Sequence, residues 1–197
     1  MSFKIVILGS GTGSNAKAIL EAEKIGELGK AETLALLSDN KGAPILDLAS
    51  QYEKKCHGIY CNPLKAKLSH TERDSFIKQV KYYNPNLIIL AGFMKILDST
   101  FINAFNGHII NLHPSLLPSF PGKDSIQKAF EFGARLTGCT VHWVTPELDA
   151  GPIIDQIAVN IEPEDSINSL TEKVHRAEHS LLPTVIKKIS LGEILMP

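Results

Sequence analysis

The sequence has no marked excess of charge and no long apolar run, and each absence excludes a class of protein. Its 197 residues carry a formal net charge of −1 at pH 7, so a basic surface for nucleic acid is not expected. No apolar run approaches the ~20 residues that a membrane-spanning helix needs. The first residues lack the charged leader and apolar stretch of a secretory signal. We therefore expect a cytoplasmic protein whose partners are small molecules, with no nucleic acid and no membrane among them.

Cysteines are few, and low-complexity segments and internal repeats are absent. The three cysteines, Cys56, Cys61 and Cys139, are an odd number and form no CxxC pair. A disulfide framework or a structural zinc site is therefore not expected, and reduced thiols are. A chain of 197 residues suffices for one sizeable core and is short for two full domains. One domain over residues 1–197 is predicted.

Short apolar runs alternate with helical patterns over most of the chain. Buried strands are predicted at 4–8, 33–37, 87–91 and 108–113. A helix is expected after Ser14, which can cap it, and another after Pro44. Residues 69–72 form a capping box ahead of a third helix, and a short helix is expected at 126–130, closed by Gly133. This alternation predicts a mostly parallel sheet with helices on both faces.

The alternation of predicted strands and helices ends in the last third of the chain. Segments 138–144 and 153–159 are both typical of strands and are separated only by a turn-rich loop, which predicts an antiparallel hairpin. A last helix is expected to begin near Asp165, and Pro183 is expected to kink or restart it. The predicted fold class is an α/β, Rossmann-like, doubly wound sheet with an antiparallel hairpin on its carboxyl-terminal side. Ligands of such sheets bind at the carboxyl ends of the strands.

A glycine loop connects the first predicted strand to the first helix. Gly9, Gly11 and Gly13 stand at alternate positions. Backbone N–H groups of such a loop, with the free N–H groups at the start of the helix, can bind an anion. The loop matches neither the GxxxxGK[ST] nor the GxGxxG pattern, which weakens an NAD-binding interpretation. A tight turn without a ligand is the structural alternative, and a phosphate site is the interpretation we favour.

The strand at 108–113 ends in the sequence Asn-Leu-His-Pro. Residues two apart in a strand point to the same face, so Asn111 and His113 are expected to project together. Their neighbours Ile110 and Leu112 are apolar and point the other way. Buried polar side chains need partners, and a satisfied hydrogen-bonded pair in the core is the structural explanation. The proline-rich turn that follows the pair favours a functional site.

A carboxylate is available in the loop of the predicted hairpin. Asp149 precedes a Gly-Pro pair there, where aspartate is also an ordinary turn residue. An amide, an imidazole and a carboxylate form a coherent catalytic set without a nucleophile. The GxSxG pattern of a nucleophilic serine is absent from the sequence. Direct acyl transfer, without a covalent enzyme intermediate, is therefore the predicted chemistry.

Four segments, in this order, closely resemble the phosphoribosylglycinamide formyltransferase family. They are SGTGSN at 10–15, AGFMKIL at 91–97, NLHPSLLP at 111–118 and ELDAGP at 147–152. The match runs from Lys4 to about Pro183, and four motifs in order are far more specific than any one of them. The resemblance implies a folate-dependent enzyme of purine synthesis. Its formyl donor would be 10-formyltetrahydrofolate, its acceptor glycinamide ribonucleotide, and it would use no metal.

The resemblance also assigns roles to residues. It implies a catalytic trio of Asn111, His113 and Asp149. It implies that the substrate phosphate and ribose are bound by Gly11, Thr12, Gly13, Ser14, Asn15 and Glu178. It implies a folate pocket lined by Phe93, Met94, Lys95, Ile96, Leu97, Val144, Glu147 and Leu148. From its own position, at the border of an apolar helix face, Glu178 is either a solvated edge or a ligand contact.

Two positions depart from the family pattern. The family usually has arginine where Lys95 stands, and it often has arginine where His70 stands. Lysine keeps the positive charge but loses the planar fork of the guanidinium group. His70 is retained as a candidate anion contact. Both changes bear on affinity more than on chemistry.

Four alternative functions remain. Methionyl-tRNA formyltransferase carries an additional carboxyl-terminal domain and formyltetrahydrofolate deformylase an additional amino-terminal domain, and 197 residues are expected to leave room for neither. A nicotinamide-dependent oxidoreductase needs an acidic ribose contact about 20 positions beyond the glycine loop. Glu32 is in that range but precedes its predicted strand. A non-catalytic nucleotide-binding module is the fourth alternative.

The histidines contain one apparent metal motif. Residues 175–179 match the HxxEH pattern of some zinc proteases, but a third ligand is missing, so no metal site is predicted. His57, His108 and His142 have no ligand spacing and are interpreted as structural, and Trp143 is interpreted as a core residue. We expect a monomer or a weak homodimer.

Overall fold

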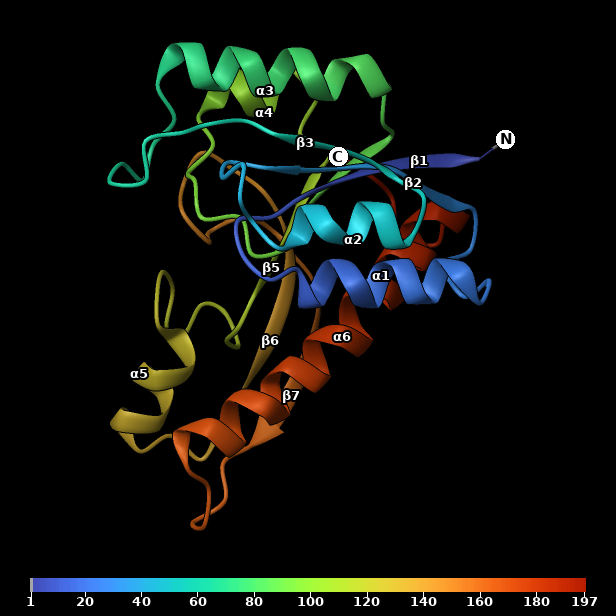
Figure 1. The fold of residues 1–197 in the computed structure, drawn as a ribbon. Helices are drawn as coiled ribbons and strands as arrows, with labels where there is room; N and C mark the ends of the chain where they lie inside the picture. The colour runs from blue at the N-terminus through green and yellow to red at the C-terminus, as the bar shows by residue number, and fades with distance from the viewer. Residues whose placement is uncertain (1) are drawn as a thin grey trace.

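Seven strands form one sheet in the order β3-β2-β1-β4-β5-β6-β7 in the computed structural model, which describes residues 2–197 (Figure 1). The strands are β1 (Phe3–Leu8), β2 (Ala31–Ser38), β3 (Lys55–Gly58), β4 (Leu87–Leu90), β5 (Ile109–His113), β6 (Leu136–Trp143) and β7 (Ile153–Asn160). Strands β1 to β5 are parallel, whereas β6 pairs antiparallel with β5 and β7 antiparallel with β6. The predicted mostly parallel sheet with an antiparallel carboxyl-terminal hairpin is confirmed.

Helices cover both faces of this sheet (Figure 1). One face carries α1 (Ser14–Lys24), α2 (Ile45–Gln51), α5 (Ser125–Phe132) and α6 (Ile167–Leu191), and the other carries α3 (His70–Tyr83) and α4 (Ser99–Asn103). Successive strand side chains alternate between these two cores: Ile5 and Ile7 face α1 and α6, whereas Val6 and Leu8 face α3 and α4. Central strands buried on both faces are therefore continuously apolar. No helix of the described residues is long and apolar enough to cross a membrane.

Several boundaries differ from those expected. Ser14 does not cap α1 but is its first helical residue, because Gly13 occupies the N-cap with a φ of 80°. Helix α6 begins at Ile167, behind a capping box at Ser166, and runs through Pro183 without interruption. The prediction that Pro183 would restart the helix is wrong, because the turns on both sides of it are anchored by buried side chains. Strand β3 and helix α4 were not predicted, since both are too short to show a period.

The topology places one crevice at the centre of the sheet. From β1 the chain moves outward to β2 and β3, then returns to β4 on the other side of β1. The carboxyl ends of β1 and β4 therefore lead away to opposite faces, which is the position where doubly wound sheets bind ligands. The glycine loop follows β1 and the segment at 91–97 follows β4, so both predicted binding segments meet at this crevice.

The glycine loop is shaped by its packing against α2. A Cβ atom at Gly13 would lie 2.7 Å from Ile45 Cγ1, whereas a Cβ at Gly11 would have no atom within 4 Å. We expect Gly13→Ala to lower the free energy of unfolding by about 1–3 kcal/mol, through overpacking and a strained positive φ. Gly11→Ala should leave it nearly unchanged. Urea denaturation measures both, and equal stability of the two variants would contradict this account of the loop.

Candidate active site

A cavity of about 610 Å³ opens at the crevice between β1 and β4. Its walls come from the glycine loop, the segment after β4, the end of β5, the loop between β6 and β7, and α6. Of the residues predicted for the site, the lining includes Gly11, Thr12, Gly13, Ser14, Asn15, Phe93, Met94, Lys95, Ile96, Leu97, Asn111, His113, Val144, Glu147, Leu148, Asp149 and Glu178. His70, at the start of α3, is exposed and lies outside the lining. The structure thus gathers all of these candidates except His70.

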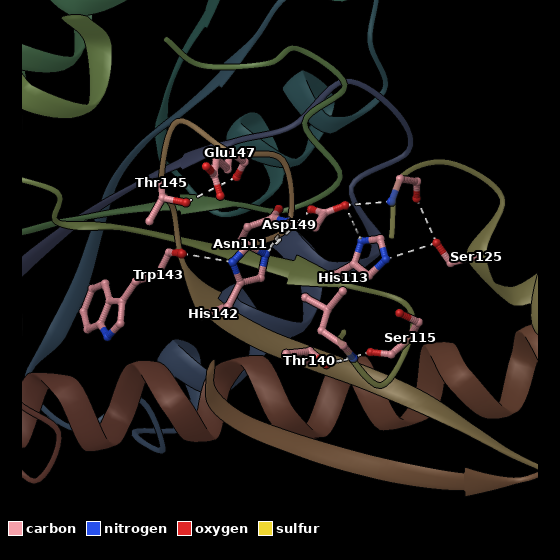
Figure 2. Close-up of polar contacts among 12 residues, drawn as sticks. Asn111, His113, Ser115, Ser125, Thr140, His142, Trp143, Thr145, Glu147 and Asp149 are labelled. Atoms are coloured by element: carbon pink, nitrogen blue, oxygen red, sulfur yellow. Dashed lines mark hydrogen bonds and ion pairs between the residues drawn. The ribbon is translucent and has the colours of Figure 1, made fainter. Parts of the chain in front are cut away.

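The imidazole and the carboxylate predicted to act together are in contact (Figure 2). Asp149 Oδ2 lies 3.4 Å from His113 Nδ1, and the two side chains are only 7% and 6% exposed. The same carboxylate oxygen accepts a 2.8 Å hydrogen bond from the backbone N–H of Gly122. Asp149 has a φ of 52°, in the left-handed region, which turns its side chain from the hairpin loop toward β5. The buried carboxylate thus has the imidazole of His113 and the backbone N–H of Gly122 as partners.

Hydrogen bonds define which nitrogen of His113 carries a proton. Nε2 lies 3.0 Å from the carbonyl oxygen of Phe120 and 3.1 Å from Ser125 Oγ. A carbonyl oxygen can only accept, so Nε2 carries a proton. Nδ1 is then the nitrogen that faces Asp149. Any proton that His113 exchanges with Asp149 or a substrate must pass through Nδ1.

A second histidine belongs to the site and was misjudged from the sequence. His142 was interpreted as structural, yet it lies directly opposite Asn111 across β5 and β6 and lines the cavity. Its Nε2 is 3.1 Å from Asn111 Nδ2 and 3.8 Å from Asp149 Oδ1. Its Nδ1 donates to the carbonyl oxygen of Trp143 at 2.9 Å. Only the antiparallel register of β5 and β6 reveals this pairing, so residue spacing carried no signal for it.

The state of His142 determines the orientation of the Asn111 amide. Burial lowers the pKa of His142 below its ordinary value, which favours the neutral ring, although the bond to Trp143 and the charge of Asp149 oppose this shift. With its proton on Nδ1, the ring accepts through Nε2, and the Asn111 amide must present Nδ2 to it. The second N–H of that amide group is then available as a donor in the cavity.

The start of α1 and the middle of α6 also line the cavity. Asn15 Nδ2 donates to Glu178 Oε2 at 3.1 Å, which joins the two helices. The first backbone N–H groups of a helix have no intrahelical partner and carry partial positive charge, so the start of α1 is suited to a phosphate. Burial raises the pKa of Glu178 to about 7, although the bond from Asn15 acts in the opposite direction. Glu178 is therefore a buried carboxylate in the site and not a solvated edge.

Lys95 lines the cavity, but its ammonium group is hydrogen-bonded to backbone carbonyl oxygens. The Nζ atom donates to the carbonyl oxygens of Asn62 at 2.8 Å and Lys65 at 2.7 Å, and it lies 3.8 Å from Asp39 Oδ2. Lys95 is 8% exposed. Its charge therefore anchors the segment after β3 to the cavity wall and is not a free cation facing a ligand.

Two alternative interpretations depended on acidic residues: a ribose contact in an oxidoreductase, and a metal ligand in the HxxEH segment. The acidic residue at the end of β2 is Asp39 rather than Glu32, and it is buried against Lys95, so it is unavailable to a ribose. In the HxxEH segment, Glu178 accepts from Asn15. Within residues 2–197 there is no group of three His, Cys, Asp or Glu side chains arranged to bind a metal ion.

These features define a class of protein. A doubly wound sheet with an antiparallel hairpin lines one cavity with an amide, an imidazole, a carboxylate and a helix start suited to phosphate. No cysteine lines that cavity among the described residues. Such a site is typical of a group-transfer enzyme. Residues 3–186 match the model of the formyl transferase family, and the chain belongs to this family.

Within the formyl transferase family, the chain is similar to several named proteins. The phosphoribosylglycinamide formyltransferase of Bacillus subtilis (strain 168) is 34% identical over 186 residues, which cover 94% of each chain. The trifunctional purine biosynthetic protein adenosine-3 of Gallus gallus is 38% identical over 194 residues, 97% of this chain and 19% of that longer protein. The crystal structure of glycinamide ribonucleotide transformylase 1 from Symbiobacterium toebii matches with a TM-score of 0.90 at 32% identity, covering 100% of this chain and 91% of that one.

The raised pKa of Glu178 makes stability depend on pH. Because this pKa moves from 4.5 to about 7 on folding, the folded protein binds the proton more tightly than the unfolded chain does. The resulting stabilisation is complete below the unfolded pKa and is lost as the pH rises through the folded one. We expect Glu178→Gln, which stays neutral, to be more stable than the wild type at pH 8 by on the order of 3 kcal/mol. Urea unfolding between pH 5 and 8 measures this, and equal pH slopes in both proteins would contradict it.

Proposed function

We propose that this enzyme transfers the formyl group of 10-formyltetrahydrofolate to the amine of glycinamide ribonucleotide, in purine biosynthesis. The observation that carries the proposal is the convergence of Asn111, His113 and Asp149 beside a helix start suited to a phosphate. The names of the similar proteins support the same reaction. No metal takes part in the proposed steps.

The two substrates are assigned to opposite ends of the cavity. The ribonucleotide phosphate would lie on the N–H groups at 11–15, and the ribose hydroxyls would donate to Glu178, whose carboxylate is already oriented by Asn15. The folate would lie between the segment at 93–97 and the loop at 144–148, which form a largely apolar wall. This arrangement places the amine and the formyl group near the catalytic trio. It also favours a phosphorylated acceptor over water, the acceptor of a deformylase.

The reaction begins with attack of the substrate amine on the formyl carbon, which forms the new C–N bond and a negative oxygen. The free N–H of Asn111 and the Nδ1–H of a protonated His113 would donate to that oxygen. Before the attack, the imidazolium form has an acceptor for each of its two protons, since Phe120 O faces Nε2 and Asp149 faces Nδ1. Donors fixed before the reaction stabilise the developing charge without reorganisation.

Collapse of the intermediate breaks the bond to the folate nitrogen, which leaves with the electron pair and must gain a proton. His113 supplies this proton from Nδ1. The amine loses its extra proton to Asp149, directly or through water. Because Asp149 Oδ2 lies 3.4 Å from Nδ1, the carboxylate can return that proton to His113. One proton thus moves from the amine to the folate nitrogen, and the enzyme is restored.

The remaining expectations concern the state of the enzyme. We expect one domain over residues 1–197, acting in the cytoplasm on small molecules as a monomer or a weak homodimer. The formal net charge of −1 supports the absence of a nucleic-acid partner. Light scattering over a range of protein concentrations measures the oligomeric state, and a concentration-independent larger assembly would contradict this expectation.

The trio makes a kinetic prediction. Asn111→Ala, His113→Ala and Asp149→Ala should each lower kcat by roughly 10²–10³-fold, because each removes an oxyanion donor or a proton acceptor. The assay follows consumption of 10-formyltetrahydrofolate with glycinamide ribonucleotide and then with water alone, and circular dichroism checks the fold.

His108→Ala is the matched control for the histidine variant. His108 immediately precedes β5 and lies outside the cavity lining, so turnover should stay near that of the wild type. Normal turnover in His113→Ala would remove the assignment. Equal consumption with water alone would indicate a hydrolase.

A further inference from the structure

Ser125, the first residue of α5, lies beside the catalytic imidazole and belongs to none of the predicted groups. It is 1% exposed, and its Oγ is 3.1 Å from His113 Nε2 and 2.8 Å from the carbonyl oxygen of Gly122. Because the carbonyl oxygen can only accept, the hydroxyl donates its proton to Gly122 and is left to accept from the Nε2–H of His113. The direction of this hydroxyl group is therefore fixed.

The contacts of Ser125 complete a ring of interactions that contains both His113 and Asp149, the two groups between which the proposed mechanism moves a proton (Figure 2). From His113 Nε2 the ring passes through Ser125 Oγ to the carbonyl of Gly122. The N–H of Gly122 then donates to Asp149 Oδ2 at 2.8 Å, and that oxygen is 3.4 Å from His113 Nδ1. Ser125 itself is absent from the cavity lining, whereas its neighbours Asp124 and Ile126 belong to it. It therefore acts on the imidazole and not on a substrate.

We propose that Ser125 is a positioning residue that keeps the proton of the neutral His113 ring on Nε2 and leaves Nδ1 free toward Asp149. The inference rests on the proposed function, in which Nδ1 gives its proton to the leaving nitrogen and regains one from Asp149. Without Ser125, Nε2–H keeps only Phe120 O as an acceptor. The neutral ring can then move its proton to Nδ1, where Asp149 accepts it, and that tautomer cannot take the proton back at Nδ1.

Ser125→Ala and Ser115→Ala form a matched pair. Ser115 is also fully buried in the connection between β5 and α5, and its Oγ donates to Ser119 O at 2.6 Å. Each variant therefore loses a buried serine hydroxyl, but only Ser125 contacts His113. We expect Ser125→Ala to lower kcat about tenfold, the usual effect of one hydrogen bond, with KM values for both substrates changed by less than about twofold. Ser115→Ala should keep kcat within about twofold of the wild type.

Nitrogen-15 NMR of the histidine ring in the folded protein provides a readout that a merely structural role would not change. At a pH where the imidazole is neutral, His113 should carry its proton on Nε2 in the wild type and in Ser115→Ala. In Ser125→Ala the fraction with the proton on Nδ1 should rise. An unchanged kcat or an unchanged tautomer in Ser125→Ala, or an equal kcat loss in Ser115→Ala, would overturn the proposal. If the wild type formylates no glycinamide ribonucleotide, the proposed function fails, while the NMR comparison still decides whether Ser125 positions the ring.

Discussion

The carboxylate of Asp149 is buried against two groups from an earlier part of the chain, and the geometry of the proposed catalytic site depends on how its charge is balanced. A buried charge is stable only when it is paired and hydrogen-bonded. Here the partners are the imidazole of His113, from the end of β5, and the N–H of Gly122, from the connection to α5. The same contacts therefore stabilise the carboxylate and join the β6–β7 loop to the strand that carries His113.

The hairpin that carries this carboxylate is held in place by close backbone packing. A Cβ atom at Gly151 would lie 1.8 Å from the carbonyl oxygen of Trp143, so only glycine allows the loop to approach the end of β6. Two residues earlier, Asp149 adopts a positive φ that an aspartate tolerates better than most side chains. The loop thus has little freedom in where it presents its carboxylate, as the proposed proton transfer between Asp149 and His113 requires.

The antiparallel hairpin also supplies the second histidine. Because β6 pairs with β5 in this direction, His142 lies opposite Asn111, and its neutral ring determines which end of the amide faces the reacting groups. The parallel strands serve a different purpose. They end at a crevice where the start of α1 offers N–H groups and the segment after β4 offers an apolar wall. In the proposed reaction, the parallel part of the sheet therefore supplies the binding surfaces, and its junction with the hairpin supplies Asn111, His113 and Asp149.

The sequence by itself determined the elements whose physical cause is local. Apolar runs such as the one in β1 predicted buried strands, the capping box at Ser69 predicted the start of α3, and the Asn-x-His spacing predicted two side chains on one face. The resemblance to a known family then indicated which loops belong together. The sequence did not predict the short strand β3 or the continuation of α6 through Pro183. Packing, and not local preference, determines whether these elements form.

Only the tertiary structure decided which groups the proposed catalytic residues contact. Strand register placed His142 beside Asn111, a left-handed turn brought Asp149 to His113, and the first turn of α5 brought Ser125 to the far side of the imidazole. It also showed that the charge of Lys95 is satisfied by backbone carbonyls, whereas the sequence left it free for a ligand. Hydrogen bonds between segments depend on distance and direction in space, and residue order along the chain specifies neither.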